Sequence, residues 1–145
     1  MFRLFCLSVL TATAVYDAAR LEIPALPCVL LLGTAVICTP PDTLMQNASA
    51  AACVWAVYLA LRALCIVLKS PVPIGMGDIK LLSILALMLG ALDCFRLLAA
   101  SGLLSGAAAA ALLLFRKAGA RSEIPFAPFI AAGYALLLLE EVYVP

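Results

Sequence analysis

The sequence predicts an all-α protein, a polytopic membrane helix bundle with about six transmembrane helices. Of its 145 residues, 67% are hydrophobic and 12% are charged, whereas a soluble domain is about half apolar and about a quarter charged. The apolar residues gather in segments at 2–19, 23–40, 46–69, 78–92, 95–115 and 124–140. Only a helix satisfies every backbone group inside one such segment in lipid.

The lengths of these segments decide how many of them can cross a bilayer. A crossing helix needs about 20 residues, and about 17 is the usual lower limit. Segments 23–40, 46–69 and 95–115 meet this requirement, the first and last segments are marginal, and the fourth is short. Six helices is our prediction, and five remains open if 78–115 is divided differently. The length allows one domain, 1–145.

Several residues mark the expected segment ends. Asp17 and Arg20 follow the first apolar run where a signal peptide would have small residues, so we expect a retained first helix. Pro40, Pro41 and Asn47 are expected in the loop between the second and third helices. Pro125 can open the sixth helix, because the first helical position does not use its N–H.

The basic residues predict the orientation in the membrane. If Arg20 is cytoplasmic, alternation of the helices places most other basic residues on that side: Lys69, Lys80, Arg116, Lys117 and Arg121. The opposite side then receives Asp42, Asp93, Glu140 and Glu141. This agrees with the positive-inside rule. It puts Asp17 and Asp78 at the same, cytoplasmic, face.

Composition also excludes some functions. No basic patch is interleaved with aromatic residues, so we expect no nucleic-acid partner. The six cysteines form no CxxC pair and the chain has no histidine, so we expect no zinc or other metal site. We expect the cysteines to be small buried hydrophobic residues.

Two carboxylates carry the functional prediction. Asp78 lies in the run GMGDIK at 75–80, at the edge of an apolar segment, and Asp17 lies at the end of another. Such groups are costly near lipid and mark functional sites, and glycines leave room for a peptide backbone to approach. Asp78 could instead be an exposed loop residue, and Asp17 could form a weak solvated pair with Arg20. Two aspartates on one membrane face favour an aspartic protease, whose carboxylates share a proton.

Three stretches resemble the type IV prepilin peptidases, membrane aspartic proteases of the GxGD type. Asp17 to Pro24 is similar to the family's D-x6-P stretch, and GMGDIKLL at 75–82 is similar to its GxGDxKLL signature. PFAPF at 125–129 is similar to its PFGPF segment, with Ala127 where glycine is usual. Ala25 also departs from the asparagine or aspartate often found after Pro24.

The resemblance implies an activity and a site. Members remove the short basic leader of type IV prepilins or pseudopilins at the cytoplasmic face of the bacterial inner membrane. Asp17 and Asp78 match the two catalytic aspartates. The residues that match the motifs, with an expected role in substrate access, are Gly75, Gly77, Lys80, Pro24, Pro125, Phe126 and Pro128. The chain lacks the paired CxxC insertion of full-length members, so we expect no methyl transfer and no cofactor.

Alternatives remain open at this level. Lys80 could extend to lipid phosphates instead of serving the site. The protein could be a non-enzymatic membrane subunit for transport or assembly, with structural or proton-carrying aspartates. It could also be a GxGD protease that cleaves other membrane peptides. The sequence leaves the pilin substrate, the oligomeric state and the separation of the two aspartates open.

Overall fold

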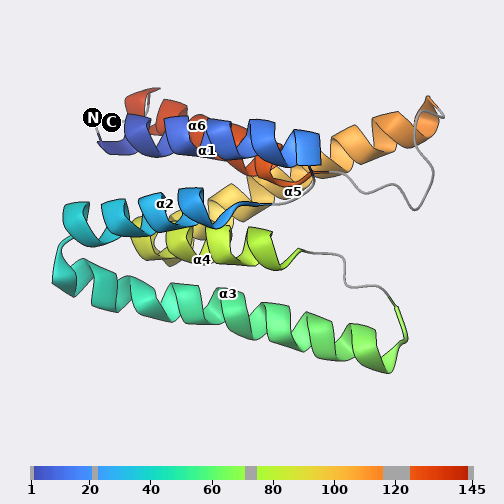
Figure 1. The fold of residues 1–145 in the computed structure, drawn as a ribbon, viewed down its shortest axis with the longest axis horizontal. Helices are drawn as coiled ribbons and strands as arrows, with labels where there is room; N and C mark the ends of the chain where they lie inside the picture. The colour runs from blue at the N-terminus through green and yellow to red at the C-terminus, as the bar shows by residue number, and fades with distance from the viewer. Residues whose placement is uncertain (1, 21–22, 71–74, 116–124, 144–145) are drawn as a thin grey trace. The chain divides into compact units, whose positions relative to one another are not determined.

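The computed structural model describes residues 2–20, 23–70, 75–115 and 125–143. These residues form six helices and no strand (Figure 1), which confirms the predicted all-α class. The helices are α1 Phe2–Arg20, α2 Ala25–Cys38, α3 Pro41–Val67, α4 Met76–Leu89, α5 Ala91–Leu114 and α6 Ala127–Tyr143. The chain divides into two compact units, residues 1–23 with 95–145 and residues 24–94.

Within the described residues, three helices are long and apolar enough to cross a membrane by themselves, namely α1, α3 and α5. The prediction that segment 23–40 is long enough was wrong, because α2 contains only 14 residues. Thr39 leaves the helix with φ −103° and ψ 130°, since the residue before a proline avoids the helical region. The first segment, expected to be marginal, meets the criterion as α1.

In the first unit, α1 packs against α6 (Figure 1). The buried residues of α1 recur at helical spacing on one face: Cys6, Leu10, Thr13, Ala14 and Asp17. The buried residues of α6 do the same: Ala127, Ile130, Ala131 and Tyr134. Each helix therefore buries one stripe, and the stripe of α1 carries a carboxylate.

Helix α5 approaches α6 closely at Gly133. A Cβ placed at this glycine would lie 2.6 Å from Ser101 Oγ and 3.3 Å from the carbonyl oxygen of Leu97. The Ser101 hydroxyl is itself held, because it donates a 2.7 Å hydrogen bond to the Leu97 carbonyl. Small residues allow such close packing of membrane helices.

In the second unit, α4 packs against α3 and α2 (Figure 1). The Asn47 side-chain amide on α3 donates a 3.0 Å hydrogen bond to the carbonyl of Leu87, one of the last α4 carbonyls without a helical partner. Asn47 therefore lies inside α3 and caps α4. Our prediction that Asn47 belongs to the loop before the third helix was wrong, because Pro41 already occupies the first turn of α3.

The cysteines are all free, and their burial varies. Cys6 and Cys94 are buried as predicted, but Cys38 and Cys53 are exposed on helix surfaces, so the general expectation of burial was wrong. The basic loop residues Arg116, Lys117 and Arg121 lie outside the described residues, so the orientation that they support stays a prediction.

Replacing Gly90 by alanine should destabilise the second unit. Gly90 ends α4 with φ +83°, and a Cβ there would lie 3.0 Å from Asn47 Oδ1. Backbone strain of this kind costs about 1–3 kcal/mol, and we expect a lower thermal unfolding midpoint in detergent. Gly33→Ala is the matched control, because nothing lies within 4 Å of its Cβ position in α2, and it should not lower the midpoint. Equal midpoints for Gly90→Ala and wild type would contradict the role of Gly90.

Replacing Gly133 by alanine should separate α5 from α6. Overpacking of this kind costs about 1–3 kcal/mol, and the thermal unfolding midpoint should fall. Ser101→Ala in the same chain removes the nearest atom and should recover part of the loss. Gly102→Ala has open space around it and serves as the control. A destabilisation that Ser101→Ala leaves unchanged would show that the Ser101 contact is not its cause.

Candidate active site

Asp17 lies on the buried stripe of α1 and is only 5% exposed. An ionised carboxylate that is buried among apolar residues needs a compensating partner. A solvated pair with Arg20 does not fit this burial of Asp17, and the Arg20 guanidinium lies 5.7 Å from the centroid of the Tyr16 ring. Asp17 is therefore an interior residue of the first unit.

The partner of Asp17 is the beginning of α6. The backbone N–H of Ala127 donates a 3.2 Å hydrogen bond to Asp17 Oδ2. Ala127 is the first residue of α6 and is 1% exposed. The first N–H groups of a helix have no partner within it, and the positive end of the helix dipole favours a carboxylate.

The PFAPF segment forms this helix start. The Phe126 carbonyl accepts hydrogen bonds from the N–H groups of Phe129, at 3.0 Å, and Ile130, at 3.2 Å. Pro125, Phe126 and Pro128 are all half-buried. The sequence predicted that Pro125 opens the sixth helix, which was wrong, because α6 begins at Ala127. The sequence also did not indicate the contact between this segment and Asp17, for which a local pattern carries no signal.

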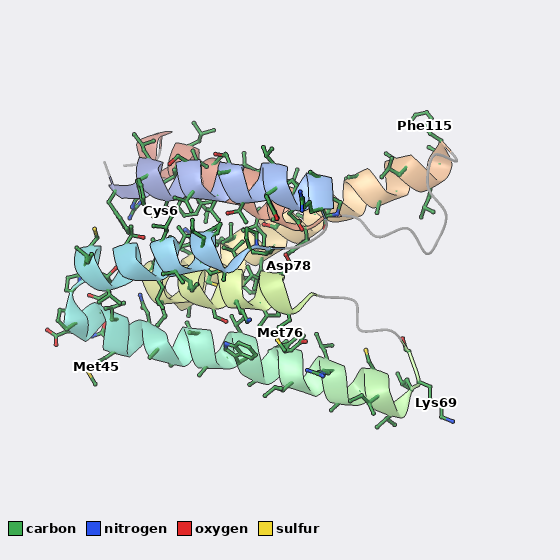
Figure 2. The ribbon with its side chains drawn as sticks, viewed as in Figure 1. Cys6, Met45, Lys69, Met76, Asp78 and Phe115 are labelled. Carbon is green, nitrogen blue, oxygen red and sulfur yellow. The ribbon has the colours of Figure 1, made fainter. Side chains whose placement is uncertain are left out.

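Asp78 lies in the first turn of α4, and Gly75 is the residue that precedes this helix (Figure 2). The Ile79 N–H donates a 3.4 Å hydrogen bond to the Gly75 carbonyl, which closes the turn. A Cβ at Gly75 would lie 3.3 Å from Asp78 Oδ2. The carboxylate thus folds back over residue 75, and the first glycine of the motif gives it room.

The rest of the motif divides between the surface and the core. Gly77 is half-buried beside Asp78. Lys80 is exposed, whereas Ile79 and Leu81 on either side of it are buried. This placement of Lys80 agrees with a side chain that reaches out of the bundle. The run from Leu81 to Ala86 is buried throughout, so α4 is the central helix of its unit.

Pro24 directly precedes α2 in an extended conformation, with φ −66° and ψ 152°. Helices α2 and α4 pack together and start at the same end of the second unit (Figure 1). The structure thus brings the Pro24 end of α2 to the Gly75 end of α4. Asp17 belongs to the first unit and Asp78 to the second, so their pairing stays a prediction.

Among the described residues, no three His, Cys, Asp or Glu side chains are grouped to hold a metal ion. Carboxylates such as those of Asp17 and Asp78 can accept a proton from a water and donate one to a carbonyl. Each lies at a helix start, Asp17 against α6 and Asp78 within α4.

Comparison with protein families gives a match over most of the chain. The type IV leader peptidase family matches residues 4–115 of the 145. The match includes Asp17, Pro24 and the motif at 75–80, and it ends before Pro125. No curated protein and no solved structure matches.

A match over most of the chain shows the family, and the long apolar helices agree with a multi-pass membrane protein. The resemblance predicted from the motifs is thereby confirmed, and it supports an aspartic-type leader peptidase. The chain belongs to the type IV leader peptidase family.

Proposed function

We propose that this protein is a membrane endopeptidase that removes the short basic leader from type IV prepilins or pseudopilins. It acts at the cytoplasmic face of the bacterial inner membrane, with Asp17 and Asp78 as the catalytic pair. Membership of the leader peptidase family supports this proposal. The observation that carries the site is Asp17, a buried carboxylate bound by the first N–H of another helix.

The chemistry needs one proton shared between two carboxylates. The ionised aspartate removes a proton from water as the oxygen attacks the scissile carbonyl carbon. The protonated aspartate donates its proton to the carbonyl oxygen, which gives a neutral tetrahedral diol. Its collapse breaks the C–N bond and returns protons to the leaving amine and to the pair. Because the two carboxylates share one proton, neither aspartate receives a fixed role.

The covalent chain supports the pairing. Asp17 precedes Pro24 by the short D-x6-P stretch. Pro24 directly precedes α2, which starts at the same end of the second unit as α4 with Gly75 and Asp78. The substrate backbone must be extended to present its scissile carbonyl. Because Gly75 has no Cβ, no side chain of residue 75 lies against the Asp78 carboxylate.

The direct test is cleavage of prepilins in membranes that contain this protein, with mass spectrometry of the pilin N-terminus. We expect leader loss with wild type and at least about a thousandfold less with Asp17→Asn or Asp78→Asn, since a missing catalytic member removes most of the rate. The product mass also tests the expected absence of methylation.

Asp42→Asn is the matched control, because Asp42 is an exposed aspartate in the first turn of α3. It should cleave as wild type does. Intact prepilin with wild type, tested with more than one pilin class, would contradict the proposed substrate. Full activity of either catalytic variant would contradict the pair.

A larger residue at position 75 should displace the Asp78 carboxylate. Gly75→Ala places a Cβ 3.3 Å from Asp78 Oδ2, and Gly75→Val adds two methyl groups there. We expect cleavage to fall by about tenfold with alanine and by more with valine, because small misplacements of a catalytic group cost about a hundredfold. Initial cleavage rates measure this order. Equal rates for Gly75→Val and wild type would show that residue 75 does not shape the carboxylate.

A further inference from the structure

We infer that the backbone N–H of Ala127 is a positioning group for Asp17, and that the segment from Pro125 to Pro128 holds this carboxylate and does not bind the substrate. The inference rests on the proposed function for the part that concerns catalysis. The contact itself stands on the structure, since Ala127 N and Asp17 Oδ2 are 3.2 Å apart and both residues are buried.

The composition of the segment selects this donor. Pro125 and Pro128 have no backbone N–H, and the Phe129 N–H is bonded to the Phe126 carbonyl. Ala127 lies between them with an N–H that the helix does not use, and it points to Asp17. Pro125 and Pro128 therefore offer no competing donor on either side, and the Ala127 N–H is the donor that the structure places on Asp17.

The donor is also held in place. Helix α6 packs on α1 through its buried stripe, and at Gly133 it lies against Ser101 and Leu97 of α5. An aspartate side chain on a rigid helix has two rotatable bonds, and one hydrogen bond from a fixed donor defines its orientation. Catalysis depends on such fixed geometry of the reacting groups.

Position 127 is restricted by the same contact. Ala127 is 1% exposed, so a long side chain there would need space occupied by its neighbours. Alanine and the glycine usual in similar segments both keep the N–H. Proline alone among the natural residues removes it, and the first position of a helix tolerates proline.

The test is Ala127→Pro in the full-length protein, with prepilin cleavage measured over a range of substrate concentrations. We expect kcat to fall by about tenfold to a hundredfold, which is the effect of losing one hydrogen bond to a charged group. We expect KM to stay within about twofold, since the variant misplaces Asp17 and leaves substrate binding intact. Ala127→Gly keeps the donor and should recover most of the kcat that proline loses.

The matched control is Ala91→Pro, because Ala91 is an exposed alanine at the first position of α5. It should leave kcat and KM unchanged. A double-mutant cycle with Asp17→Ala tests the contact without substrate. Ala127→Pro should lower the thermal unfolding midpoint by about 4 °C or more in the wild-type chain and by less than half of that beside Asp17→Ala.

Two results would overturn the inference. The first is a raised KM with an unchanged kcat for Ala127→Pro, which would assign the segment to substrate binding. The second is an equal loss of stability with and without Asp17. If Ala127→Pro does not fold, exchange of Ala127 for lactic acid replaces the N–H by oxygen without a ring and gives the same readouts. A wild-type protein that cleaves no prepilin would contradict the proposed function. The double-mutant cycle would still test the contact between Ala127 and Asp17, because its readout is the thermal unfolding midpoint.

Discussion

A carboxylate inside an apolar helix pair imposes a constraint on everything that packs around it. Asp17 is buried on α1, and an unpaired ion in such a place would cost several kcal/mol or more. The first N–H of α6 meets this demand because a helix start offers donors that its own backbone cannot use. The close packing of α6 on α1, and of Gly133 on Ser101, also keeps the Ala127 N–H next to the Asp17 carboxylate.

The position of the Asp78 carboxylate is set by local structure. The carboxylate lies in the first turn of its own helix, over Gly75, so local backbone geometry decides its position. The other end of α4 is fixed by Asn47 and by Gly90, whose positive φ few residues adopt. One aspartate thus depends on contacts between distant segments, and the other depends mainly on its immediate neighbours. A peptidase with this arrangement can be damaged at the first aspartate by changes far from the motif.

Helix ends and long-range contacts are the features of this protein that local sequence patterns did not predict. Hydropathy located all six helices but misplaced their ends by a few residues, because apolar composition does not register where a proline stops the helix, as at Thr39. Asn47 looked like a loop residue because asparagine favours turns. In the structure its side-chain amide donates a hydrogen bond to a carbonyl 40 positions away. Tertiary packing therefore outweighs the turn propensity of asparagine at this position.

The sequence by itself determined the membrane helix bundle, the family, and the placement of Asp78 beside glycine at the edge of an apolar segment. These follow from composition and from neighbours within four residues, which set helical periodicity. Only the tertiary structure decided what Asp17 binds, because its donor lies 110 positions further along the chain. In helices that are apolar on most faces, hydropathy does not rank one neighbour over another. Close packing and the buried hydrogen bond from Ala127 to Asp17 therefore help to pair α1 with α6.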